Sequence, residues 1–176
     1  MRSLVEQLSQ YATYHRDRRN IATHFVGIPL IVQAVAILLA RPVLAETGPL
    51  ALSAATAVTL LAVLYYLRLD LRFGLVMAVL MALALWCAQQ VAALSTTAWL
   101  GWGIGLFVVG WLFQFVGHYW EGRKPAFVDD VIGLVIGPLF VVAEAGFVLG
   151  LRRELQQQIE QRAGPLRGGL TAEASG

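Results

Sequence analysis

The stretch FGLVMAVLMALALWCAQQVAAL, residues 73–94, decides the fold class of this chain. No charged side chain occurs between Phe73 and Leu94. A helix needs about 20 predominantly apolar residues to cross the hydrocarbon core of a bilayer, and this stretch is long enough. Its apolar residues run on without alternating, whereas the strands of a transmembrane barrel alternate. The stretch therefore predicts a membrane-spanning helix.

Three further apolar stretches of similar length flank it, at residues 21–40, 49–67 and 98–120. The 176-residue chain is 58% hydrophobic and 14% charged, whereas a soluble domain has about 25% charged residues. We therefore expect an all-α fold, a polytopic membrane helix bundle with four spanning helices. The net charge of +2 is small and gives no reason to expect a nucleic-acid partner.

A fifth apolar stretch, residues 128–149, differs from the other four. Asp129 and Asp130 open it, Pro138 interrupts it, and Glu144 follows. A carboxylate in the middle of a bilayer costs about 2.5–3.5 kcal/mol, and proline removes a backbone donor from a helix. These features predict a broken or re-entrant helix that packs against protein.

The two ends of the chain are more polar than the segments between them. Residues 4–14 read as a short amphipathic helix, because apolar residues such as Leu4 and Leu8 recur at helical spacing. We expect residues 1–161 to form a single membrane domain and residues 162–176 to form a flexible tail.

Positive residues gather before the first predicted span, between the second and third, and after the fourth. They are Arg16, Arg18, Arg19, Arg68, Arg72, Arg123 and Lys124. Short positive loops stay in the cytoplasm, so these three segments are expected on the cytoplasmic side. The chain is accordingly predicted to be a multi-pass membrane protein with a cytoplasmic N-terminus, in the inner membrane if it is bacterial.

The three histidines of the chain fall at the same predicted face of the membrane. His15 and His24 flank the start of the first span, and His118 lies near the end of the fourth. The loop charges that predict this topology do not include the histidines. Because His15 lies nine residues before His24, the two can meet only if the backbone turns between them. Asp17 is a candidate to cap the helix that follows such a turn.

Two polar stripes accompany these histidines at helical spacing. Asn20 and His24 are four residues apart, and Gln114, His118 and Glu121 follow one another at intervals of four and three. Imidazole suits iron, zinc or copper, and histidines with one carboxylate make a plausible iron or zinc ligand set. The sequence therefore predicts a metal site whose ligands are drawn from His15, His24, His118 and Glu121.

Alternative roles stay open for several of these residues. Glu121 can instead pair with Arg123 or Lys124 in the following loop. Arg16 and Arg19 can either anchor the helix at anionic headgroups or hold a carboxylate substrate.

These residues also carry a resemblance to a known family. The first block is Tyr14-His15 with Asn20, His24, Gly27 and Pro29, in the pattern H-x4-N-x3-H-x2-G-x-P. The second is Gln114 to His118, followed by Glu121 and Lys124-Pro125-Ala126, and a third is Gly137-Pro138 followed by Glu144. The chain resembles the fungal 2-hydroxy fatty acid dioxygenase family of the endoplasmic reticulum, which acts in phytosphingosine degradation, and its bacterial membrane homologues.

The resemblance implies an iron(II)-dependent dioxygenase that shortens a 2-hydroxy fatty acid by one carbon with molecular oxygen. It implies Fe(2+) as cofactor, a fatty-acid-like lipid as substrate, and His15, His24 and His118 as the catalytic residues. The residues that we assign to substrate binding are Arg16, Arg19, Asn20 and Gln114.

Two other functions fit the same residues. One is a non-catalytic membrane transporter or lipid-binding scaffold, in which the histidines and Glu121 form a polar network. The other is a zinc-dependent membrane hydrolase. Metal analysis together with an assay for oxygen uptake would distinguish the three.

Overall fold

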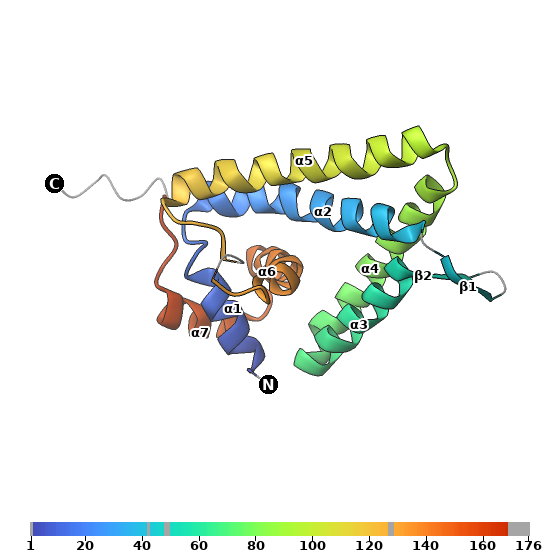
Figure 1. Ribbon diagram of the computed structural model, residues 1–176. Helices are drawn as coiled ribbons and strands as arrows, with labels where there is room; N and C mark the ends of the chain where they lie inside the picture. The colour runs from blue at the N-terminus through green and yellow to red at the C-terminus, as the bar shows by residue number, and fades with distance from the viewer. Residues whose placement is uncertain (1, 42, 48–49, 127–128, 169–176) are drawn as a thin grey trace. The chain divides into compact units, whose positions relative to one another are not determined.

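The computed structural model describes residues 2–41, 43–47, 50–126 and 129–168. In chain order its elements are α1 (Leu4–Ala12), α2 (Arg18–Ala40), β1 (Val43–Thr47), β2 (Leu50–Ser53), α3 (Ala54–Leu69), α4 (Leu71–Ala92), α5 (Thr96–Glu121), α6 (Gly133–Val148) and α7 (Arg153–Ala163) (Figure 1). The predicted all-α membrane class is confirmed. The antiparallel pair β1–β2 is not predicted from the sequence.

Three helices within the described residues, α2, α4 and α5, are long and apolar enough to cross a membrane. They agree with three of the predicted spans to within a few residues. Within the predicted span at 49–67, residue 49 lies outside the described residues, residues 50–53 form β2, and α3 starts at Ala54. The Ser53 hydroxyl accepts a hydrogen bond from the amide of Thr56, and this N-cap sets the start of α3.

The fifth apolar stretch forms α6, which is bent by 118° relative to α7. If this bent pair counts as one span, the number of candidate spans rises to four. The helix continues through Pro138, so the break is not at the proline that suggested it. It lies after Val148, where Gly150 (φ 76°) and Arg152 (φ 54°) adopt left-handed conformations that end a helix.

The chain divides into two compact units, unit 1 (Met1–Ile28 with Leu112–Gly176) and unit 2 (Pro29–Trp111). The single domain expected over residues 1–161 stays a prediction. Unit 2 has a small apolar core of Ile37, Ala40, Ala55 and Ala88.

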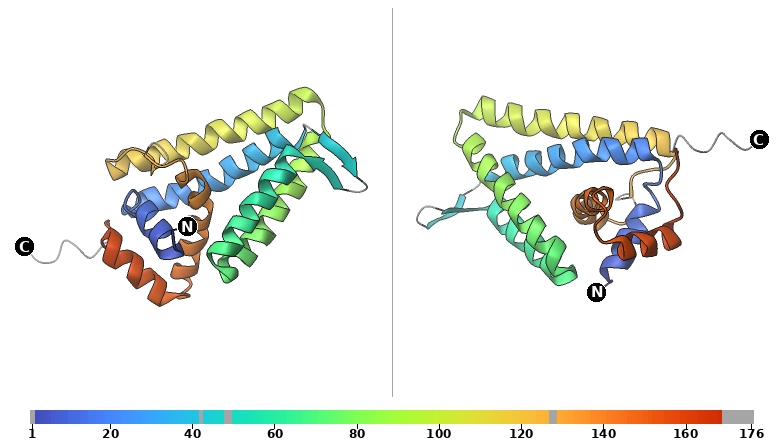
Figure 2. Two further views of the ribbon diagram at one scale, coloured as in Figure 1. Left: turned by 60° about the horizontal axis from the view of Figure 1, so that its bottom comes forward. Right: turned by 180° about the vertical axis from the view of Figure 1, so that it is seen from behind.

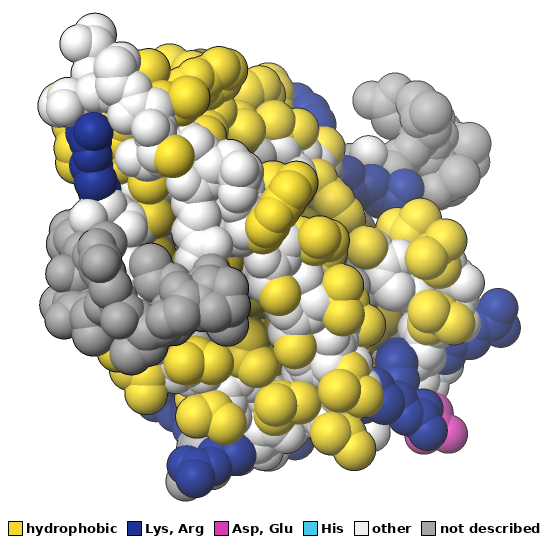
Figure 3. Space-filling view, turned by 90° about the vertical axis from the view of Figure 1, so that its right-hand side faces the viewer, with side chains coloured by type: hydrophobic (Ala, Val, Ile, Leu, Met, Phe, Trp, Pro, Cys, Tyr) yellow, Lys and Arg dark blue, Asp and Glu magenta, His cyan; other side chains and the backbone are white. Residues whose placement is uncertain are grey.

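The outward side chains of unit 2 are largely hydrophobic. Leu61, Leu83 and Trp86 are each more than half exposed, and hydrophobic side chains also predominate on the face drawn in Figure 3. Exposed apolar surface on this scale suits lipid rather than water.

In unit 1, α1 packs against both α6 and α7 (Figure 2). A capping box between Ser3 and Glu6 starts α1, and its apolar face is buried, as the helical spacing predicts. The unit 1 ends of α2 and α5 approach closely at Gly117, where a Cβ atom would lie 2.2 Å from Thr23 Oγ1. Glycine at this position therefore allows two histidine-bearing helices to meet.

Candidate metal centre

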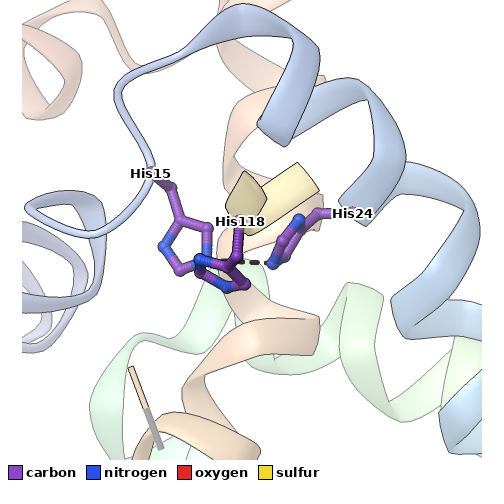
Figure 4. Close-up of side chains that lie close together, drawn as sticks. All are labelled: His15, His24 and His118. Atoms are coloured by element: carbon purple, nitrogen blue, oxygen red, sulfur yellow. Dashed lines mark hydrogen bonds between the residues drawn. The ribbon is translucent and has the colours of Figure 1, made fainter. Parts of the chain in front are cut away.

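His15, His24 and His118 converge inside unit 1 (Figure 4). One ring nitrogen of each lies within 4.8 Å of the corresponding nitrogens of the other two. The ring centroids are 4.4 Å apart for His15 and His24, and 5.0 and 5.1 Å from these two rings to His118. All three side chains are buried. The meeting of the three imidazoles, predicted from loop charges and spacing, is therefore present in the structure.

Two of the imidazoles are oriented by backbone carbonyls four residues before them. Nδ1 of His15 lies 2.8 Å from the Tyr11 carbonyl oxygen, and Nδ1 of His24 lies 2.8 Å from that of Asn20. A carbonyl oxygen only accepts, so each Nδ1 must carry the proton and donate it. In the neutral imidazole this leaves the lone pair on Nε2. The two Nε2 atoms face each other at 2.9 Å.

Two lone pairs at this distance repel unless a proton or a metal cation lies between them. Burial, and secondarily the neighbouring His24, lowers the pKa of His15 well below its usual value, which disfavours a shared proton. Two imidazole nitrogens bound at about 2.0–2.1 Å and at right angles around one ion would lie about 3 Å apart. The residues present therefore fit a divalent cation that prefers imidazole ligands.

His118 and two aromatic residues pack around His15. Nδ1 of His118 is buried and has no hydrogen-bond partner among the described residues. The Tyr11 ring stacks on the His15 ring, with centroids 4.2 Å apart and planes 7° from parallel, and Phe140 lies 5.6 Å from His15. Sequence reasoning did not place Tyr11 in the site, although its position four residues before His15 was a usable signal.

Glu121, predicted as a fourth ligand, uses its carboxylate in another way. Oε2 accepts hydrogen bonds from the backbone amides of Arg16 (3.0 Å) and Asp17 (2.8 Å) and from Nδ2 of Asn20 (3.0 Å). Oε1 pairs with the guanidinium of Arg167. The carboxylate thus joins the helix of His118 to the residues that follow His15 and to the residue that orients His24. Its role as a metal ligand stays a prediction that these contacts do not favour.

The alternative pairing of Glu121 with the following loop is not what the structure contains. Lys124 forms an ion pair with Asp129, and Arg123 donates to the Thr13 carbonyl oxygen at 2.8 Å. The positively charged side chain that pairs with Glu121 is instead that of Arg167, which lies in the predicted flexible tail. The sequence offered no signal for this contact.

The four residues assigned to substrate fall into two groups. Asn20 and Gln114 are buried on the histidine-bearing helices. The Arg16 guanidinium is buried and bonds within the chain, with Nε donating to the Ala12 carbonyl oxygen at 2.9 Å. Arg19 is exposed and forms an ion pair with Asp17. The predicted cap is also present, because Oδ1 of Asp17 accepts from the amide of Arg19 at 2.8 Å.

The fold and the site define a helical membrane protein with a buried three-histidine cluster at the ends of two apolar helices. Residues 1–149 match the family described as "2-hydroxy-palmitic acid dioxygenase Mpo1-like". The Saccharomyces cerevisiae protein named "2-hydroxy-palmitic acid dioxygenase MPO1" is 31% identical over 161 residues, covering 89% of this chain and 87% of the yeast protein. The chain belongs to the Mpo1-like family, and the resemblance noted from its motifs is confirmed. No solved structure matches the chain significantly.

Proposed function

We propose that this chain is an iron(II)-dependent membrane dioxygenase that shortens 2-hydroxy fatty acids by one carbon. One observation carries the proposal: the Nε2 atoms of His15 and His24 face each other at 2.9 Å, with His118 beside them, in a member of a dioxygenase family. In a bacterium the expected location is the inner membrane, with the N-terminus and the site on the cytoplasmic side.

His15, His24 and His118 are the residues that would hold the metal. Three imidazole ligands do not complete the coordination of iron, which leaves room for exogenous ligands. When bound, ferrous iron supplies the one-electron and dioxygen chemistry that side chains lack. The protein contributes the tautomers fixed by Tyr11 and Asn20 and an aromatic wall that excludes water.

Gln114 is the best-placed residue to meet the polar head of the substrate. It lies one helical turn before His118, and its buried Nε2 has no acceptor among the described residues. An unpaired buried donor is costly, so an acceptor supplied by a ligand would stabilise it. The carboxylate or hydroxyl of a 2-hydroxy acid offers such an acceptor.

The surroundings of the site suit a lipid substrate. The Arg19 guanidinium lies 5.5 Å from the centroid of the Trp120 ring, at the ends of α2 and α5 that carry the histidines. Tryptophan and arginine at a helix end are typical of headgroup depth. A fatty acid could therefore place its head at the site while its tail stayed in the leaflet.

The decisive experiment measures iron content and oxygen uptake on adding 2-hydroxypalmitate to the purified protein. We expect His24→Ala and His118→Ala to lose the bound iron and at least about a hundredfold of the activity. Gly101→Ala is the matched control, because a Cβ atom there meets nothing within 4 Å. Full iron occupancy with unchanged turnover in both histidine variants would overturn the proposal. Bound zinc without oxygen uptake would favour a hydrolase, and absence of metal would favour a scaffold.

The role of Gln114 has its own test in the same assay. Gln114→Leu should retain its iron and raise the KM for 2-hydroxypalmitate about tenfold, because one hydrogen bond to a charged group contributes roughly 1.5–3 kcal/mol. An unchanged KM would remove Gln114 from the substrate contacts.

A further inference from the structure

The C-terminal segment, residues 153–168, lies outside the part of the chain that matches the family, residues 1–149. Helix α7 buries Leu155 and Ile159 and packs against α1. It ends at Gly164, whose φ of 86° turns the backbone out of the helix. This turn leads residues 164–168 to the segment that follows His15.

There the two segments are joined by backbone hydrogen bonds. The amide of Arg167 donates to the Arg16 carbonyl oxygen at 2.7 Å, and the amide of Arg18 donates to the Arg167 carbonyl oxygen at 3.2 Å. Nη1 of Arg16 adds a bond to the Gly164 carbonyl oxygen at 2.9 Å. Residues 164–168 belong to the predicted flexible tail, whose flexibility stays a prediction, and residues 169–176 lie outside the described residues.

The side chain of Arg167 makes the contact that matters for the metal centre. Its guanidinium pairs with the carboxylate of Glu121, whose side chain is 0% exposed. A buried carboxylate needs a compensating charge, and Arg167 supplies one in direct contact. Through its other oxygen, Glu121 holds the amides of Arg16 and Asp17.

We propose that the C-terminal segment is a positioning element of the metal centre, with Arg167 acting through Glu121. Arg167 fixes the Glu121 carboxylate, and Glu121 fixes both the backbone after His15 and the Asn20 side chain. The Asn20 carbonyl oxygen in turn orients His24. Arg167 does not touch the reacting atoms. The inference rests on the proposed function, since it concerns how tightly the same three histidines hold their ion.

The test measures the affinity of the full-length protein for ferrous iron, by anaerobic competition with a chelator. Loss of a residue that orients metal ligands typically weakens metal binding about 10–100-fold, and we expect a loss in this range for Arg167→Ala. Arg167→Lys keeps the cation without the planar fork and should lie between Arg167→Ala and the wild type. Arg162→Ala is the matched control, an exposed arginine of α7, and should bind iron like the wild type.

A double variant separates positioning from general loosening of the fold. If Arg167 acts through Glu121, Arg167→Ala should weaken iron binding little further in a Glu121→Gln background. If Arg167→Ala weakened iron binding as much in the Glu121→Gln background as in the wild type, the inference would be overturned. It would also be overturned if Arg167→Ala lowered the unfolding temperature but left the iron affinity unchanged. A wild-type protein that binds no ferrous iron would instead overturn the proposed function, so the two failures are distinguishable.

Discussion

The two compact units bury their side chains by different means. Of the buried polar side chains in the described part of the chain, all except Ser53 and Thr59 belong to unit 1. Unit 1 packs charged and amide groups against one another, whereas unit 2 has a small apolar core and many exposed hydrophobic residues. A buried polar group is costly unless it is paired, so unit 1 requires specific partners and unit 2 requires mainly a lipid surrounding.

This difference explains why the candidate site lies in unit 1. An ion held by imidazoles needs partners that orient the rings. The carbonyl oxygens of Tyr11 and Asn20 orient His15 and His24, and Glu121 holds the backbone that follows His15. The two units should therefore respond differently to comparable changes.

The largest expected difference concerns buried charge. Nη2 of Arg16 lies 3.9 Å from Oε1 of Glu144, and both side chains are at most 10% exposed. Glu144→Leu leaves a buried guanidinium without this partner and should lower the free energy of unfolding by about 3 kcal/mol. Thr59→Val, the matched change in unit 2, removes only a buried hydroxyl and should cost no more than about 1 kcal/mol.

Thermal unfolding of both variants in the same detergent micelles measures this difference. Equal destabilisation by the two changes would contradict the contrast between the units. If Glu144→Leu left the stability unchanged, the hydrogen bonds from the Arg16 guanidinium to the neighbouring carbonyl groups would be sufficient without the carboxylate.

Removal of the proposed metal ion should have the next largest effect, and this effect should be confined to unit 1. An ion present at a hundred times its dissociation constant stabilises the folded state by about 2.7 kcal/mol. After chelation, amide hydrogen exchange should speed up at residues 15–24 and 114–121 and stay unchanged in α3. Uniform acceleration along the chain would indicate that the two units unfold as one.

The long helices and the histidine cluster could both be predicted from the sequence. The runs that became α2, α4 and α5 are long and free of charge in their middles, so length and hydropathy identify them. The cluster was predictable because loop charges and histidine positions are independent signals that agree.

Contacts between distant polar residues could not be predicted in the same way. The pair Arg167–Glu121 joins a tail without periodicity to a helix end. The strand β2 was missed because its apolar residues continue into the next run, so composition does not mark the boundary. The serine cap at Ser53 did mark it.

A smaller difference is expected where the helices cross at glycines. A Cβ atom on Gly117 would lie 2.4 Å from Oδ1 of Asn20 and near Thr23 Oγ1, which donates to the Asn20 carbonyl oxygen at 2.7 Å. The Thr23 hydroxyl is held by that bond, and the Asn20 side chain is held through its Nδ2, which donates to Glu121 at 3.0 Å, so Gly117→Ala should cost about 2 kcal/mol and weaken metal binding. A Cβ atom on Gly103 would meet the flexible Leu38 side chain at 2.5 Å. Gly103→Ala should therefore cost less than about 1 kcal/mol in the same thermal assay and leave metal binding unchanged.

The smallest effect is expected for a hydrogen bond inside unit 2. Nε1 of Trp99 donates to the Ile37 carbonyl oxygen at 2.7 Å. Hydrogen bonds between membrane helices contribute about 0.6 kcal/mol on average, so Trp99→Phe should lower stability by roughly that amount. Trp102→Phe is the control, because that side chain is 56% exposed and its loss should have no measurable effect. A Trp99→Phe cost as large as that of Glu144→Leu would mean that unit 2 also depends on specific polar partners, and the contrast between the units would fail.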